Sequence, residues 1–197
     1  MPKDLMVGED AYHLQTEILG LLPEHPKLIF ALKNKYADDH AWDTALEADP
    51  SIFAFYKDPE YNDCLKAVLL DGRNIQYVPY RNLTYEICVT SIRSFPRAIL
   101  LIPREKLDMR MIQQAVDLDP SLIKEYEDEL DGFYIEDKIK EIPELILSLN
   151  HPDDDCIIIA INANPGLMFK MPKEWWTETV KKEIRETHPD WDSYIPN

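Results

Sequence analysis

Residues 84–103 read TYEICVTSIRSFPRAILLIP, and this stretch holds one complete copy of a repeating unit. A cap-forming threonine opens the stretch, twelve positions before the helix-breaking Pro96. Apolar residues precede Pro96 at helical spacing, Ile99 and Ile102 follow it, and Pro103 closes the unit. This order predicts a helix, a tight turn, a second short helix and a stop.

The same phrase recurs eight times along the 197 residues, at spacings of 22 to 24 residues. Its Pro or Gly anchors are Pro26, Pro50, Gly72, Pro96, Pro120, Pro143, Pro165 and Pro189. A period in this range is the signature of a stacked-repeat architecture. We therefore predict an all-α fold: one domain over residues 1–197, a helical-repeat solenoid of about eight helix–turn–helix units of 22–24 residues in one superhelix.

Apolar residues recur at fixed distances from each anchor. Positions minus eight, minus five and minus four form one stripe of a helix, and positions plus three and plus six form a second, shorter stripe. At minus eight the chain has Ile18, Trp42, Cys64, Cys88, Ile112, Ile135 and Ile157. Two charged residues stand at otherwise apolar or small positions: Lys138 at minus five and Arg185 at minus four. Both stripes are predicted to form the core.

Helix-capping residues recur in the same register. The expected N-caps are Asp38, Glu60, Thr84, Asp108, Asp131, Asp153 and Thr177 at minus twelve, with Asp49, Asp71, Asp119 and Asn164 at minus one. The anchor proline then falls at the first position of the second helix, where its missing N–H costs nothing. Caps, breakers and apolar stripes all indicate the same fold.

The third unit carries the clearest family resemblance. It reads Cys64-Leu-Lys-Ala67-Val68, then Gly72, then Ile75-Gln76-Tyr77-Val78-Pro79, and the next unit opens TYEIC at residue 84. These phrases resemble a family of short helical repeats from bacteria, phages and large viruses, built on T-x-E-x-C-x-x-A-V … G … A-L-x-Y-V-P units. The match is clearest over residues 60–103. The resemblance implies an all-helical array and carries no activity with it.

Composition narrows the classes of partner. The net charge of −16 opposes binding to phosphate backbones and anionic membranes, so we expect a protein partner with a basic surface. The first residues lack the layout of a signal peptide, and no apolar run approaches the roughly 18 residues that suggest a membrane span. Three cysteines in or beside core positions indicate reduced thiols, and we expect a cytoplasmic protein, in the host cytoplasm if the source is viral.

Catalytic signatures are absent from the sequence. It contains no GxxxxGK[ST], GxGxxG, GxSxG or HExxH phrase, and the cysteines lack the paired spacing that zinc requires. Residues 153–155 are three consecutive aspartates, which could ligate Mg²⁺ only with convergent carboxylates from elsewhere. Their place at the start of a repeat favours helix capping. We therefore expect no enzyme activity, cofactor or metal.

Charge varies strongly along the chain. Residues 61–106 hold 7 bases and 4 acids, whereas residues 107–155 hold 4 bases and 15 acids. The acidic stretch predicts a partner-binding patch of Asp117, Glu125, Glu127, Asp128, Glu129, Glu136, Asp137, Asp153, Asp154 and Asp155. The preceding stretch gives a secondary basic band of Arg73, Arg81, Arg93, Arg97 and Arg104. A plain solvated surface is the alternative explanation of both.

Three functions remain open at this point. The first is a non-enzymatic, acidic protein-interaction module, an inhibitor carried by a phage or mobile element that occupies a host protein, in its most specific form by imitating nucleic acid. The second is a structural or assembly scaffold whose end repeats mediate oligomerisation. The third is a metal-dependent enzyme with a site on one face of the array.

Overall fold

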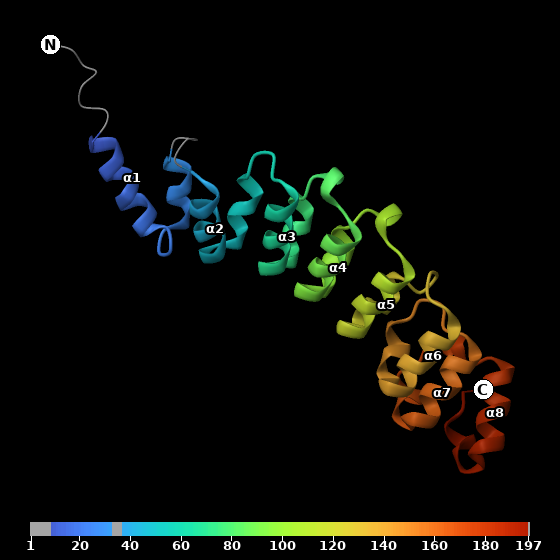
Figure 1. Ribbon diagram of the computed structural model, residues 1–197. Helices are drawn as coiled ribbons and strands as arrows, with labels where there is room; N and C mark the ends of the chain where they lie inside the picture. Colours follow the sequence, from blue (N-terminus) through green and yellow to red (C-terminus); the bar gives the residue numbers. More distant parts are fainter. Residues whose placement is uncertain (1–8, 33–36, 197) are drawn as a thin grey trace. The chain divides into compact units, whose positions relative to one another are not determined.

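The computed structural model describes residues 9–32 and 37–196, with side-chain surroundings from residue 13 onward (Figure 1). These residues are all-helical and contain no strand. Their α-helices are α1 (Glu9–Leu21), α2 (Asp39–Ala48), α3 (Tyr61–Leu70), α4 (Tyr85–Ser94), α5 (Met109–Leu118), α6 (Gly132–Glu141), α7 (Asp154–Ala163) and α8 (Glu178–Thr187). The all-α prediction is confirmed.

The second element of each unit is a 3₁₀-helix. The anchors begin η1 (Pro26–Ala31), η2 (Pro50–Phe55), η3 (Gly72–Tyr77), η5 (Pro96–Leu101), η7 (Pro120–Glu125), η8 (Pro143–Ser148), η9 (Pro165–Phe169) and η11 (Pro189–Tyr194). A 3₁₀-helix has three residues per turn, so the anchor and position plus three lie on one face. Position plus six is the extended residue directly after the helix, as at Tyr56, Val78 and Ile102. Each anchor therefore starts a 3₁₀-helix.

Three more 3₁₀ turns follow the prolines at plus seven. They are η4 (Tyr80–Asn82), η6 (Arg104–Lys106) and η10 (Lys173–Trp175), each directly after a proline. From the sequence, Pro79, Pro103 and Pro172 predict only the end of the preceding helix. Val78 and Ile102, which directly precede Pro79 and Pro103, are extended. The 3₁₀-helix therefore ends before the proline, and a new turn begins beyond it.

The expected caps form. Asp38, Thr84, Asp108, Asp131, Asp153 and Thr177 each accept a hydrogen bond from the backbone N–H three positions on. Glu60 takes the same position, and its own N–H donates to the Asp63 carboxylate at 2.8 Å. At minus one, Asp49, Asp71, Asp119 and Asn164 each accept from the N–H two positions on. These oxygens satisfy N–H groups that have no partner inside their helices.

The predicted core positions are largely buried. At minus four, Leu22, Leu46, Val68, Ile92, Val116, Ile139 and Ile161 are all buried, and plus three is buried from Ile29 to Met168. Two further buried positions were missed, minus nine and plus two, which include Met111 and Leu122. A helix that packs against two neighbours buries a wider stripe than one period of apolar residues indicates.

Contacts run between adjacent repeats within each of two compact units, which divide after Lys106. In the first unit, α3 packs against α4, and α4 packs against both η3 and η5. In the second unit, α7 packs against α6 and α8 and against η8 and η9. The 3₁₀-helices also pack in succession, η2 on η3 and η7 on η8. Each repeat thus buries its apolar faces against its neighbours.

Polar side chains bridge the repeats as well. The amide of the buried Asn74 donates to the carbonyls of Ala67 and of Pro50, which lies one repeat earlier. Tyr134 donates from its hydroxyl to Asp117 at 2.7 Å, again in the preceding repeat. These bonds fix the register of neighbouring repeats because each donor meets an acceptor at only one relative position.

Candidate functional site

Four carboxylates of the predicted acidic patch surround one surface hollow in the second unit. Glu125, Glu127, Asp128 and Glu129 line a hollow of about 390 Å³. Its other lining residues are Lys124, Asn150 and His151. Five consecutive residues thus carry four acids to one place on the surface.

The local fold explains why these acids face outward. η7 ends at Glu125, and the buried Tyr126 then turns the chain, which leaves helical conformation at φ −133° and ψ 19°. Leu130 is also buried, and its N–H donates to the Tyr126 carbonyl at 3.0 Å. The two apolar residues fasten the ends of the turn to the core. The acids between them are left on the outside of the turn.

Glu127 has a structural role within this hollow. Its carboxylate accepts hydrogen bonds from the backbone N–H groups of Asn150 at 2.7 Å and His151 at 2.8 Å. Asn150 in turn donates from its side-chain amide to the Lys124 carbonyl at 3.0 Å. Charge-assisted bonds of this kind are roughly twice as strong as neutral ones. Glu127 therefore joins two repeats, whereas Glu125, Asp128 and Glu129 are exposed.

The remaining acids of the predicted patch do not line this hollow, although Asp153 lines an adjoining one together with Glu127 and Asp128. Asp153 caps α7, and Asp154 accepts a hydrogen bond from the Thr177 hydroxyl at 2.9 Å, whereas Asp155 is exposed in the first turn. Glu136 and Asp137 both pair with one cation, described next. Most of these acids are therefore engaged by groups of the chain itself.

Lysines of α6 neutralise part of the acidic stretch. Lys140 lies 2.9 Å from Asp137 and 3.9 Å from Glu136. Lys138 lies 2.9 Å from Asp117 and 3.0 Å from Glu141. Lys138 occupies a core position of its repeat, and its aliphatic stem packs there while its ammonium reaches the surface. Partial burial opposes ionisation of Asp117, but the hydrogen bonds from Lys138 and Tyr134 hold its pKa below the ordinary value.

The basic band lies in the first unit and is also partly neutralised. Arg73 pairs with Asp71 at 2.8 Å, and Arg81 pairs with Asp58 in the preceding repeat. Arg93, Arg97 and Arg104 are exposed. The Arg73 guanidinium also lies 5.9 Å from the centre of the Phe95 ring. At least two of the five arginines therefore form ion pairs, one within a repeat and one between repeats.

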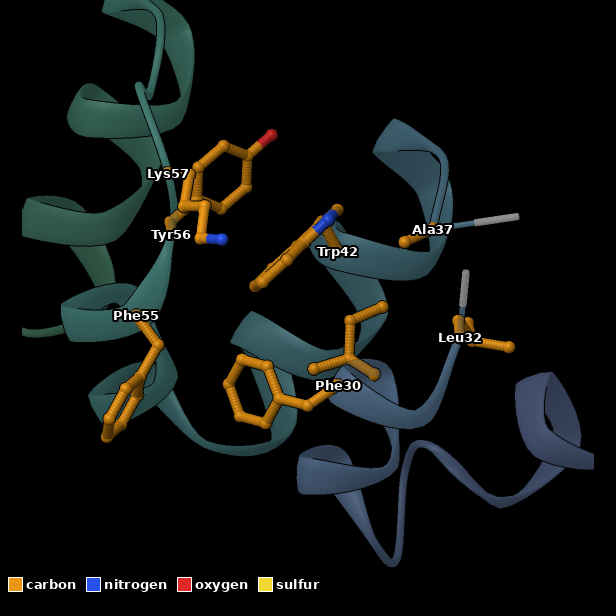
Figure 2. A pocket seen from close by; sticks show the side chains of 8 residues that line it. Phe30, Leu32, Ala37, Trp42, Phe55, Tyr56 and Lys57 are labelled. Atoms are coloured by element: carbon orange, nitrogen blue, oxygen red, sulfur yellow. The ribbon is translucent and has the colours of Figure 1, made fainter. Parts of the chain in front are cut away.

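An aromatic cavity in the first unit was missed by the sequence interpretation. Phe30, Trp42, Phe55 and Tyr56 line it together with Ile29, Leu32, Ala37 and Lys57, and its volume is about 360 Å³ (Figure 2). Trp42 at minus eight and Tyr56 at plus six stand at predicted core positions, whereas Phe30 and Phe55 stand just beside the core stripes. One signal was available: Phe30 and Phe55 stand at plus four and plus five, and the last two repeats place Phe169 and Tyr194 at these same positions.

Side chains at plus four and plus five of successive repeats contact each other in both units. The rings of Phe30 and Phe55 pack edge-to-face with centroids 5.4 Å apart, and Phe169 and Tyr194 do so at 5.9 Å. Position plus four of one repeat therefore lies beside position plus five of the next. All four rings are exposed, from 47% for Phe30 to 72% for Phe169. Only the first pair borders the aromatic cavity just described.

Neither a metal centre nor a membrane span is found within the residues that the structure describes. Over these ranges no group of three or more His, Cys, Asp or Glu side chains converges on a position where it could hold a metal ion. None of the helices there has the length and apolar character to cross a membrane. The three cysteines are buried, and burial raises the pKa of each thiol.

Comparison with known proteins gives no further guide. No family model, no curated protein and no solved structure matches the chain.

Proposed function

We propose that this chain is a non-enzymatic helical-repeat protein that binds a protein partner with a basic surface. The observation that carries the proposal is the hollow at residues 125–129, where four carboxylates gather on one turn. A concentration of one charge sign attracts and orients a partner of opposite charge. We further propose that the repeats form one solenoid, because the side-chain bridges run between neighbours about one repeat apart.

The charge distribution supports the second unit as the binding part. Residues 107–197 carry 21 acids and 9 bases, whereas residues 1–106 carry 16 acids and 12 bases. Caps and ion pairs engage many of these acids, which lowers the charge that can act on a partner. In the turn at residues 125–129, Glu125 lies 3.7 Å from Lys124 and Glu127 accepts two backbone N–H groups. Glu125, Asp128 and Glu129 are nevertheless exposed on the surface.

The most specific form of this proposal is an inhibitor that occupies a nucleic-acid site on a host protein. The acidity of the chain and the phage and viral distribution of the family that it resembles both favour this form. A complex built on carboxylates facing a basic cleft weakens steeply as salt rises, because the interaction is screened. Affinity that barely changes with salt would rule out nucleic-acid imitation.

The decisive experiment compares two charge-matched variants in an affinity capture from host lysate. The test variant carries Glu125→Gln, Asp128→Asn and Glu129→Gln, and the control carries Glu174→Gln, Glu183→Gln and Asp190→Asn, which are exposed acids of the same unit. Both lose three negative charges. We expect the wild type and the control to retain a basic protein at low salt and release it at high salt.

The test variant should lose this protein at low salt. Equal retention by both variants would show that the turn at residues 125–129 is not the binding surface. Equal loss by both would mean that only the overall charge matters. Circular dichroism of each variant checks that the helices are intact.

An assembly scaffold is the second candidate function. The exposed Phe169 and Tyr194 near the end of the chain favour it, since exposed aromatic pairs make good contacts between subunits. Light scattering at high protein concentration tests it directly. A monomer under these conditions would remove assembly as the function, whereas a dimer lost on Phe169→Ser would favour it.

A metal-dependent enzyme is the remaining alternative, and a thermal-shift series with Mg²⁺, Mn²⁺, Ca²⁺ and Zn²⁺ tests it. We expect no metal-specific rise in the unfolding temperature, because the acids of residues 153–155 serve as a cap, a hydrogen-bond acceptor and an exposed first-turn charge. A specific rise that disappears with Asp154→Asn or Asp155→Asn would contradict the non-enzymatic proposal.

A further inference from the structure

The aromatic cavity of the first unit is distinct from the acidic turn. Its four rings form a continuous series in which each contacts the next. Ring centroids lie 5.4 Å apart for Phe55 and Phe30, 5.9 Å for Phe30 and Trp42, and 4.3 Å for Trp42 and Tyr56. Figure 2 shows Trp42 between Phe30 and Tyr56, so the tryptophan is central to the cavity. A volume of about 360 Å³ suits a single side chain or another small group.

The rings are accessible from solvent. Phe55 is 65% exposed, and Trp42 and Tyr56 are half-buried. The face of an aromatic ring carries partial negative charge, so a group of such faces attracts cations, most strongly when one ring is an indole. The composition of the lining therefore favours a positively charged ligand over an anion.

The chain around the cavity is negatively charged, which also favours a cationic ligand. Residues 37–66 hold 8 acids and 2 bases. Burial chiefly, and then the charges of Asp63 and Asp39, raise the pKa of Tyr56 to about 12. Lys66 pairs with Asp43 and Glu47, so part of the negative charge is compensated there. Asp63 accepts the Glu60 N–H at 2.8 Å.

We propose that this cavity binds an alkylammonium group, presented by a methylated lysine side chain of a partner protein. Methyl groups on the nitrogen spread the positive charge and weaken its hydration, so less is lost when the ring faces replace water. The aliphatic stem of the lysine packs against Phe30 and Phe55 at the open side. The nearby carboxylates add attraction that a neutral ligand of the same shape cannot use.

Lys57 is the cation within the lining, and it limits the affinity of the site. Its ammonium repels an incoming cation. Removal of this charge with Lys57→Gln should therefore tighten binding of an alkylammonium ligand, by about threefold. Binding of a neutral ligand should not change.

A titration followed by NMR tests the site on the intact chain. The probe is Nα-acetyl-trimethyllysine amide, and its control is the neutral analogue in which a tert-butyl group replaces the trimethylammonium group. The reporter is the indole N–H of Trp42, one of 4 tryptophans, assigned by comparison with Trp42→Phe. We expect a saturable shift of this signal, with at least tenfold weaker binding of the neutral analogue.

Two variants at equivalent repeat positions sharpen the test. Phe55→Ala should weaken binding about fivefold, since it removes one ring of the cavity. Tyr194→Ala removes the aromatic side chain at the same position of the last repeat and should leave binding unchanged.

Three results would each overturn the proposal: no saturable shift of Trp42, equal affinity for the charged and neutral probes, or equal loss in both variants. The comparison of the two probes on the wild type decides the matter even if Phe55→Ala does not fold. The inference does not depend on residues 125–129. A failure here therefore leaves the acidic turn untouched, and a failure of the lysate experiment leaves the cavity untouched.

Discussion

The backbone N–H of Gly72 donates a hydrogen bond to the side-chain oxygen of Ser94 in the next repeat, at 3.0 Å. Gly72 holds the anchor position that proline takes in the other seven repeats, and proline has no N–H to donate. The glycine also lets the next repeat approach closely, because a Cβ at this position would lie 2.2 Å from the Ser91 carbonyl oxygen. Gly72, the one anchor that is not a proline, therefore forms a close contact between two repeats.

Gly72→Ala should destabilise the protein. The added Cβ would meet the Ser91 oxygen and the backbone nitrogen of Phe95, at 2.2 and 2.9 Å, and backbone atoms cannot move aside cheaply. We expect a loss of about 1–3 kcal/mol in the free energy of unfolding, the range typical of overpacking. Urea denaturation measures it. Gly132→Ala is the control, since a Cβ there meets nothing within 4 Å. Equal stabilities of the two variants would contradict this account.

Removal of the α7 cap should cost more than removal of a neighbouring charge. Asp153 accepts the Cys156 N–H at 2.7 Å, and Asp153→Ala should lower the free energy of unfolding by about 1 kcal/mol. Asp155→Ala removes the same charge from the exposed first turn without removing the cap. Thermal unfolding of both variants tests the distinction. If Asp155→Ala were as damaging, general electrostatics rather than capping would explain residues 153–155.

The bridge from Asp117 to Lys138 predicts a dependence of stability on pH. The pKa of Asp117 is lower in the folded chain than its ordinary value of 3.8, so its stabilising effect is complete above that value. The effect is lost as the pH falls through the lower, folded pKa. Asp117→Asn should therefore cost about 0.5 kcal/mol at pH 7, a typical value for an exposed ion pair. The difference from the wild type should shrink below pH 3.8 in urea titrations; a constant difference would exclude ionisation as its cause.

The three thiols should be inert in the folded protein. Cys64, Cys88 and Cys156 are at most 2% exposed, and burial raises the pKa of each, which disfavours the reactive thiolate. A thiol reagent such as DTNB should react with all three in guanidinium chloride and only at the rate of unfolding in native buffer. Rapid modification of one cysteine under native conditions would show that its repeat opens locally.

Much of this fold can be predicted from the sequence because the repeat presents each local rule eight times. The anchors fix where each 3₁₀-helix starts, and the acids at minus twelve and minus one fix the helix caps, as seen at Asp108 and Asp119. These effects act within a few residues along the chain. The turn at residues 125–129 could also be anticipated, since its acids are adjacent in the sequence.

Relations between repeats could not be predicted in the same way. The wider buried stripe at Met111 and Leu122 depends on having a neighbour on both sides. Lys138 stands at a position that is apolar in most other repeats, and nothing in the sequence explains its charge. In the structure it pairs with Asp117 of the preceding repeat. The aromatic cavity joins Phe30, from one repeat, to Phe55, from the next. None of these contacts is local in sequence.

The sequence by itself determined the repeat, its helices, their caps and the banding of charge, because backbone propensity and capping act over a few residues. Only the tertiary structure decided which surface groups meet. In the structure, Arg73 and Arg81 of the basic band and part of the acidic stretch form ion pairs. Four aromatic rings line one cavity. Distances between residues one repeat apart depend on how neighbouring helices pack. That packing is set by the shapes of many side chains together rather than by any single stretch of the chain.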